Sequence, residues 1–187
     1  MLKDLILKNR SYRRFYQNEP VSRETLKELV DLARLSGSAR NAQPLRYYLS
    51  ETPQVNDQIF AHLSWAAFLK DWDGPVQGER PSAFIVMLLD TRIASNYFCD
   101  DGIASQSILL GATEKGLGGC IIGSVDRLPL QKALQLPEYY KIIHVIALGK
   151  PKEEVILETM QGDNFRYWRD EKNVHHVPKR NLDDLIV

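Results

Sequence analysis

Apolar residues near the start of the chain recur at the spacing of amphipathic helices. Leu2, Leu5 and Ile6 predict a short helix that runs into an arginine-rich segment. A second helix is expected after Ser22, a candidate N-cap, and should stop at Gly37. The apolar face of this second helix has the i, i+3, i+4, i+7 spacing and consists of Leu26, Leu29, Val30 and Ala33.

Apolar runs further along the chain predict strands. Arg46–Glu51 is expected to be a strand, and Thr52-Pro53 should open a helix that the threonine hydroxyl caps. Ala83–Leu89 is a continuous apolar run and Lys141–Leu148 is a nearly continuous one, as is typical of buried strands. Asp71–Pro81 is polar and interrupted by prolines, so we expect a surface loop there, with a role that the sequence does not reveal.

The second half of the chain begins with a predicted long helix, Asp101–Lys115, rich in small and apolar residues and therefore expected to be buried on most sides. Gly116 is interpreted as its C-terminal cap, leading into an apolar strand around Cys120-Ile121-Ile122. Pro129–Leu136 should be a short helix.

Helices that alternate with few strands favour an α+β fold, an α/β sandwich in which helices flank a small mixed or antiparallel sheet. We expect a single domain over residues 1–187, with residues 151–187 as a C-terminal extension. This extension is polar until its apolar last residues, so it should wrap over the domain or over a second subunit.

Charge and cysteine content narrow the possible functions. Lys and Arg number 24, as do Asp and Glu, so no general attraction to nucleic acid or to an anionic membrane is expected. Cys99 and Cys120 lack the spacing of a zinc site and are interpreted as buried small hydrophobes. Without an evident signal peptide or an apolar stretch of about twenty residues, the expected location is the cytoplasm.

Candidate chemistry concentrates in two segments, N-R-S-Y-R-R-F at Asn9–Phe15 and S-G-S-A-R-N-A-Q-P-L-R at Ser36–Arg46. Arginine guanidiniums beside a serine hydroxyl match the oxygens of a phosphate group. Small and amide residues before a proline suit hydrogen bonding to a heteroaromatic edge. A second basic site, Lys179-Arg180, lies in the C-terminal extension. Together these features predict a site for a phosphorylated planar ligand.

Other functional interpretations are weaker. The glycines at Gly116–Gly123 follow a helix rather than a strand, and Ile121 stands where a dinucleotide-binding fingerprint needs its third glycine. His175-His176 should point to opposite faces of a strand, which argues against a metal pair. The sequence suggests no Ser–His–Asp triad, and Tyr167-Trp168 is interpreted as a packing cluster.

The chain resembles the nitroreductase family of flavin mononucleotide (FMN) enzymes over nearly its whole length. R-S-Y-R-R-F at Arg10–Phe15 and S-A-R-N-A-Q-P at Ser38–Pro44 are similar to the first two family motifs. D-G-I-A-S-Q-S-I-L-L-G-A at Asp101–Ala112, followed by K-G-L-G-G-C, resembles the central helix and the glycine turn. H-V-P-K-R-N-L-D-D-L at His176–Leu185 resembles the C-terminal phosphate segment. Asn9 and Leu45 depart from the family pattern, where many members carry an arginine and an aromatic residue.

The resemblance implies a homodimer with FMN at the subunit interface and the C-terminal extension wrapped around the partner. It implies that the flavin carries the chemistry, with no catalytic side chain, and the histidine spacing already argues against a metal. Phosphate or ribityl contacts would come from Arg10, Ser11, Arg13, Lys179 and Arg180. The flavin would contact a turn that comes largely from the partner subunit and consists of Ser38, Ala39 and Asn41, with Gln43 in support. The flavin ring would lie beside Ile122 and Gly123, with a backbone N–H near its N5 atom.

The activity implied by the resemblance is the transfer of hydride from NAD(P)H through flavin N5 to a nitroaromatic, a quinone or a similar small oxidised acceptor. Two alternatives stay open. One is different flavin chemistry on the same fold, such as dehalogenation or dehydrogenation, and the other is a flavin-binding redox module without turnover. A nucleic-acid module is disfavoured by the zero net charge.

Overall fold

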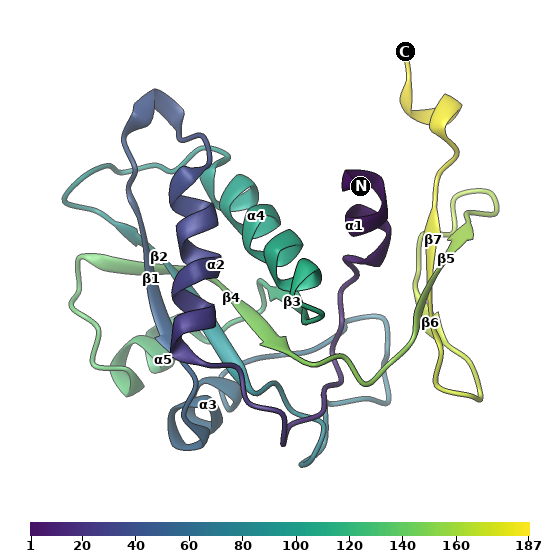
Figure 1. Ribbon diagram of the computed structural model, residues 1–187, viewed down its shortest axis with the longest axis horizontal. Helices are drawn as coiled ribbons and strands as arrows, with labels where there is room; N and C mark the ends of the chain where they lie inside the picture. Colours follow the sequence, from purple (N-terminus) through teal and green to yellow (C-terminus); the bar gives the residue numbers. More distant parts are fainter.

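The computed structural model describes residues 1–187, and its centre is a four-stranded sheet in the order β1-β2-β4-β3 (Figure 1). Every neighbouring pair in this sheet is antiparallel. The strands are β1 (Leu45–Ser50), β2 (Ala83–Asp90), β3 (Gly118–Ile122) and β4 (Tyr140–Gly149). The sheet with its flanking helices confirms the predicted α+β class.

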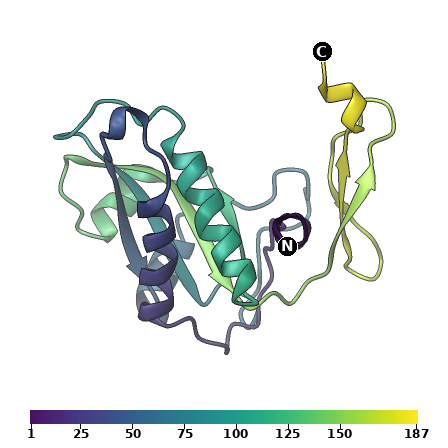
Figure 2. The same cartoon turned by 45° about the horizontal axis from the view of Figure 1, so that its top comes forward.

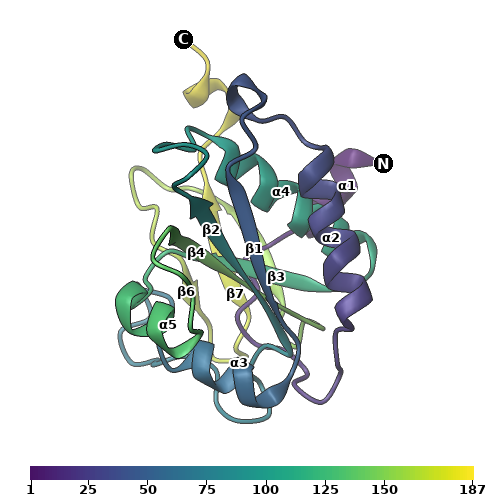
Figure 3. The same cartoon turned by 90° about the vertical axis from the view of Figure 1, so that its left-hand side faces the viewer.

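Helices cover both faces of the sheet, as Figures 1 and 3 show. One face carries α2 (Arg23–Leu35) and α4 (Asp100–Glu114), which pack against each other. The other face carries α3 (Pro53–Phe60) and α5 (Arg127–Ala133). A single turn of 3-10 helix, η1 (Ala39–Asn41), leads from α2 into β1. No helix combines the length and the apolar character that crossing a bilayer requires.

The alternation of side chains along β2 explains why its sequence is a continuous apolar run. Ala83, Ile85 and Met87 join the core under α2 and α4, whereas Phe84 and Val86 join the core under α3 and α5. All eight residues of β2 are buried. A strand covered on both faces has no polar side, so the period-2 signal of a half-exposed strand is absent.

The C-terminal extension forms a second, smaller sheet, which we call the arm (residues 155–179). The arm has the order β5-β7-β6, with β5 and β7 parallel and β6 and β7 antiparallel. Its strands are β5 (Val155–Thr159), β6 (Trp168–Arg169) and β7 (His175–Lys179), and the 3-10 helix η2 (Leu182–Leu185) follows. The arm stands apart from the main sheet, and α1 (Leu2–Lys8) lies between α4 and the arm (Figures 1 and 2).

Several local predictions are confirmed. The Ser22 hydroxyl accepts a hydrogen bond from the Thr25 amide and caps α2. Gly116 has a φ of 71° after α4 and donates to the Thr113 carbonyl, while Leu117 donates to Ala112. These two bonds form a Schellman motif, which confirms the glycine as a helix cap.

Other local predictions are wrong. The Thr52 side chain makes no capping hydrogen bond at the start of α3. Helix α5 begins at Arg127 rather than Pro129, because proline is tolerated anywhere in a first turn, where the backbone N–H groups lack helical partners. Cys99 is exposed, whereas Cys120 is buried as predicted.

Candidate functional site

A cavity of about 340 Å³ opens beside β3 and is bounded by four parts of the chain that are distant in sequence. Its walls are the segment after α1, the middle of α4, strand β3 and the arm. None of its 12 lining residues is acidic, so we call it the cationic cavity. It is lined by Asn9, Arg10, Ser11, Arg13, Gln106, Leu109, Gly119, Ile121, Tyr167, His175, Val177 and Lys179.

The segment after α1 runs extended along β3 and reaches the loop before β2. The Tyr12 amide donates to the Gly119 carbonyl at 3.1 Å, and the Phe15 amide donates to the Glu79 carbonyl at 2.9 Å. A Cβ on Gly118 would collide with the Tyr12 ring, and a Cβ on Gly119 would collide with the backbone of β4. The glycines of β3 therefore serve close packing, which places this segment, with Arg10 and Arg13, at the cavity wall.

A buried carboxylate, Glu153, fixes the backbone between Arg13 and Arg14. Its Oε1 accepts hydrogen bonds from both amides, and its Oε2 accepts one from Arg169 Nη2 at 2.9 Å. The Glu153 side chain is 0% exposed, and the Arg169 guanidinium packs over the Trp72 ring at 4.2 Å. Since Arg169 lies in β6, this ion pair ties the arm to the cavity wall.

The Arg13 guanidinium faces the cavity without a carboxylate partner. Its Nη1 donates to the Ser11 carbonyl at 3.3 Å and lies 3.4 Å from His175 Nε2. The guanidinium also sits 5.0 Å from the centre of the Tyr167 ring. Its positive charge is therefore balanced only by dipoles and an aromatic face, which favours a bound anion.

Arg10 and Arg14 have different environments. Arg10 Nη2 donates to the Ile6 carbonyl at 2.6 Å, its Nε is buried without a partner, and burial lowers the pKa of this guanidinium. Arg14 forms a two-bond pair with Glu79, at 2.6 and 2.8 Å. The Arg14 bonds and Lys152 lower the pKa of Glu79 to about 2. Arg14 therefore anchors the loop before β2 and does not contribute to the cationic cavity.

His175 is fully buried, and its Nδ1 has no hydrogen-bond partner. Burial, followed by the nearby charges of Arg13 and Arg169, lowers the pKa of this imidazole to about 4. His175, Val177 and Lys179 lie at alternate positions of β7 and share the face that lines the cavity. At neutral pH the cavity therefore contains a neutral imidazole between arginines.

Stability is expected to fall between about pH 6.5 and pH 4 because of His175. The unfolded chain binds a proton at the ordinary histidine pKa of about 6.5, whereas the folded chain resists protonation until about pH 4. A group with a lowered folded pKa contributes stability above its unfolded pKa and loses it as pH falls. Urea midpoints measured from pH 7.5 to pH 4.5 should decline less for His175→Gln than for the unmodified protein, and parallel declines would contradict this assignment.

The second motif of the sequence lies in a different place, at the N-terminal end of α4. The Asp100 carboxylate accepts hydrogen bonds from the Ser38 hydroxyl at 2.7 Å and from the Ala39 amide at 2.8 Å. Gln43 Nε2 donates to Asn41, and both Asn41 and Gln43 have positive φ angles, of 53° and 51°. Asp100 thus fixes the conformation of the turn.

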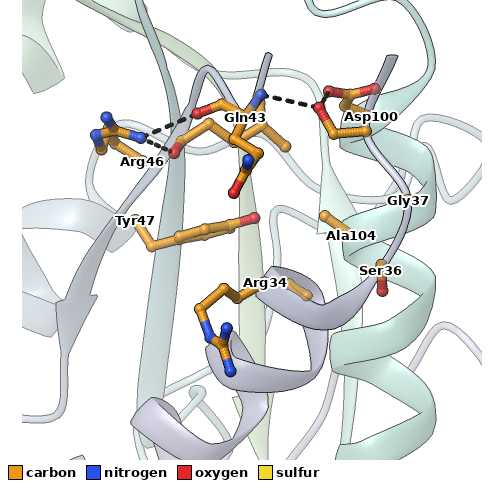
Figure 4. Close-up of a pocket in the computed structure, with 11 residues that line it drawn as sticks. Arg34, Ser36, Gly37, Gln43, Arg46, Tyr47, Asp100 and Ala104 are labelled. Atoms are coloured by element: carbon orange, nitrogen blue, oxygen red, sulfur yellow. Dashed lines mark hydrogen bonds between the residues drawn. The ribbon is translucent and has the colours of Figure 1, made fainter. Parts of the chain in front are cut away.

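A pocket of about 120 Å³ lies beneath this turn (Figure 4). Ser38, Gln43 and Asp100 line it together with Tyr47, whose hydroxyl lies below the Gln43 side chain in the view shown. Burial and the Asp100 charge raise the pKa of Tyr47 to about 12. This pocket shares no lining residue with the cationic cavity, so one chain does not bring the first two motifs together.

Ile122 and Gly123 line a third hollow, of about 110 Å³, between the end of β3 and the segment Ser64–Ala67. Three of its lining residues, Arg13, Ile121 and Tyr167, also line the cationic cavity. A Cβ on Gly123 would meet no atom within 4 Å, so the backbone there is open to a ligand. The cationic cavity and the open backbone at Gly123 are therefore neighbours.

Comparison with known proteins identifies the family. The sequence model of a protein family, described as the nitroreductase family, matches residues 6–150 of the chain. The chain belongs to the nitroreductase family. This confirms the resemblance found in the sequence motifs.

Individual relatives agree with this assignment. The oxygen-insensitive NADPH nitroreductase of Helicobacter acinonychis is 28% identical over 199 residues, covering 87% of this chain and 93% of its own. A nitroreductase family protein of Streptococcus pneumoniae has the same fold, with a TM-score of 0.71, 15% identity and coverage of 100% and 99% of the two chains. An FMN-dependent nitroreductase of Clostridium difficile has a TM-score of 0.65, 21% identity and coverage of 85% and 91%.

The structure brings only some of the predicted site residues of this nitroreductase family member into one place. The cationic cavity is lined by Arg10, Ser11, Arg13 and Lys179. Arg180 is not among its lining residues, and its Nη1 donates instead to exposed Asp163 at 3.1 Å. The turn made of Ser38, Ala39, Asn41 and Gln43 lies at the end of α4, away from this cavity.

The side chains that shape the cavity include several that were not predicted. Tyr167 and His175 line it, and Glu153 and Arg169 hold its wall. His175 was recognisable in principle, because the period-2 spacing of His175, Val177 and Lys179 marks one face of a strand that also carries a basic residue. Tyr167, Glu153 and Arg169 belong to contacts between distant segments and carry no local signal.

A Ser–His–Asp arrangement occurs elsewhere in the fold. Ser105 Oγ lies 2.9 Å from His144 Nε2, and His144 Nδ1 lies 3.9 Å from Asp101. Ser105 is 0% exposed, so a substrate does not reach its hydroxyl. Burial also lowers the pKa of His144. We interpret the arrangement as a packing contact between α4 and β4.

Proposed function

We propose that the protein is an FMN-dependent NAD(P)H oxidoreductase that transfers hydride through flavin N5 to a nitroaromatic, a quinone or a similar small oxidised acceptor. The observation that carries the proposal is the cationic cavity, which is free of acidic residues and lies on a nitroreductase fold. The relatives include an NADPH nitroreductase and an FMN-dependent nitroreductase, which supports the same activity class.

The donors in the cavity fit the phosphate end of FMN. Arg10 Nε and His175 Nδ1 are buried without partners, although buried polar atoms in folded proteins nearly always have one. Arg13 and Lys179 form no ion pair with a carboxylate. An anion with several oxygens would satisfy these groups, and bonds to charged donors are among the strongest hydrogen bonds.

The residues of this chain would bind and orient the cofactor rather than react with substrate. When bound, FMN supplies hydride transfer at N5, as flavins do generally. Arg10, Arg13 and Lys179 would hold the phosphate, with Glu153 fixing the backbone of Arg13. The open backbone at Gly123 would face the ring. Burial raises the pKa of Cys120 to about 12, so this nearby thiol is not a nucleophile at neutral pH.

We further propose that the site is completed by a second copy of the chain. The turn at Ser38–Gln43 and the cationic cavity are separate within one chain, and a homodimer would bring one to the other. Exposed apolar side chains are available for such an interface on α1, which lies between α4 and the arm, and at the C-terminus, which extends away from the main sheet (Figure 2). They are Leu2, Ile6, Leu7, Leu182, Leu185, Ile186 and Val187.

The purified protein is expected to be yellow, to release FMN rather than FAD on acid treatment, and to sediment as a dimer. Stopped-flow absorbance should show bleaching of the flavin by NADH or NADPH and its recovery on addition of a quinone or a nitroaromatic compound. Bleaching without turnover would favour the redox-module alternative. Colourless protein that takes up no FMN at micromolar concentration would refute the proposal.

A further inference from the structure

The Arg127 guanidinium, in the first turn of α5, is surrounded by backbone carbonyl groups. Its Nη2 donates to Gly123 at 3.1 Å and to Ile143 at 2.8 Å, its Nε donates to Ile142 at 3.1 Å, and its Nη1 reaches Val125 at 3.5 Å. No carboxylate forms an ion pair with it. A planar fork of five donors suits such a set of acceptors better than a lysine ammonium does.

The carbonyls of β4 need this arginine because β3 is short. The last residue of β3, Ile122, pairs with Val145, so the part of β4 before Val145 has no β3 neighbour. A bulge at Ile143 also interrupts the pairing of β4 with β2, since Met87 pairs with His144 and Leu88 with Ile142. Arg127 therefore supplies the donors that a longer β3 would have supplied.

The turn Gly123–Val125 is held on two sides. On one side, the Ser64 amide donates to the Ser124 carbonyl and the Asp126 amide donates to the His62 carbonyl, both at 3.0 Å. On the other side, Arg127 holds the Gly123 carbonyl. The peptide group is planar, so a fixed Gly123 carbonyl also fixes the direction of the Ser124 N–H. The remaining side of this turn is open and lines the hollow beside the cationic cavity.

We propose that Arg127 is a positioning residue that, by holding the Gly123 carbonyl, sets the direction of the Ser124 backbone N–H for the flavin ring. The proposal rests on the proposed function for the identity of the ligand, but the fixing of the turn by Arg127 is a property of the chain alone. Arg127 contacts the carbonyls from behind the turn and does not line the hollow itself. It therefore acts through the backbone.

The test compares Arg127→Gln and Arg127→Lys with Lys132→Gln, which removes the same charge from the same helix without touching a carbonyl. Hydrogen exchange at the Ser64 and Asp126 amides should be at least about tenfold faster in Arg127→Gln, since several hydrogen bonds are lost. With FMN bound, the single-turnover rate of flavin reduction should fall about tenfold, because misplacement of a reacting group lowers the rate steeply. The dissociation constant for FMN should change less than about threefold, because the phosphate donors are intact.

Arg127→Lys should recover part of the protection and part of the rate, since an ammonium reaches fewer carbonyls. Lys132→Gln should behave as the unmodified protein. Unchanged exchange at Ser64 and Asp126 in Arg127→Gln would overturn the proposal, and so would a rate loss shared equally by Lys132→Gln. If the unmodified protein binds no FMN, the proposed function fails, whereas the exchange measurement on the same FMN-free protein still decides whether Arg127 fixes the turn.

Discussion

Replacing Arg169 with methionine is expected to lower the free energy of unfolding by about 3–5 kcal/mol, the usual cost of removing one partner of a buried ion pair. Glu153 would remain, with its side chain 0% exposed, and would lose the guanidinium that donates to Oε2. The Arg13 and Arg14 amides bond to Oε1 and cannot replace a full positive charge. Urea denaturation followed by tryptophan fluorescence would measure the change.

Two further variants separate the ion pair from a general effect of mutating the arm. The double variant Glu153→Gln with Arg169→Met should regain more than half of the lost stability, because a neutral amide leaves no buried charge uncompensated. Arg166→Met, at an exposed arginine without an ion pair, should change stability by no more than about 0.5 kcal/mol. A loss in Arg166→Met as large as in Arg169→Met would show that the buried pair is not responsible.

The main sheet and its helices were predictable because their signals are local. Helix α2 has an N-cap residue, a periodic apolar face and a terminating glycine within one continuous stretch of sequence, Ser22–Gly37. Strands β2 and β4 are apolar along nearly their whole length because helices cover both faces of the sheet. Gly116 could be recognised as a helix cap because it directly follows the long predicted helix.

The arm was not predictable because its structure depends on pairing between distant segments. Val155–Thr159 and His175–Lys179 pair in parallel across a connection that contains β6. Neither strand has a long apolar run, because only Val155–Leu157 are consecutive apolar residues and most residues of both strands are half-buried. The sequence therefore indicated only that the extension had to lie against something, whereas the structure shows a small sheet tied to the cavity wall by Arg169 and Glu153.

In the candidate site, too, residues with a local sequence signal were predicted and contacts between distant segments were not. The arginines at Arg10 and Arg13 were found from residue type and spacing alone. Lys179 and Arg180 were predicted together, yet neighbouring residues at a strand end face opposite sides, and only Lys179 lines the cavity. Arg180 pairs with Asp163 in the loop before β6, a contact that no local pattern contains.

The loss of FMN affinity on combining Arg13→Ala with Lys179→Ala is expected to be the largest effect on binding. Each side chain would supply a charge-assisted hydrogen bond to the phosphate, worth about 1.5–3 kcal/mol, so each single variant should bind FMN about ten- to a hundredfold more weakly. Lys179 is the more exposed of the two and should lie near the lower value. If the two losses add, the double variant should bind roughly 10²–10⁴-fold more weakly. Titration of the FMN-free protein, followed by the quenching of flavin fluorescence, would give the dissociation constants.

Arg180→Ala is the matched control, because it removes the same charge one residue further along and its guanidinium is occupied by Asp163. Its FMN affinity should stay within about threefold of the unmodified value. Raising the salt concentration should weaken binding by the unmodified protein more than binding by the double variant, since the attraction between the cavity and the phosphate is electrostatic. Equal losses in Arg180→Ala and Lys179→Ala would mean that the phosphate is held outside the cationic cavity, at the end of β7 where both cations are within reach.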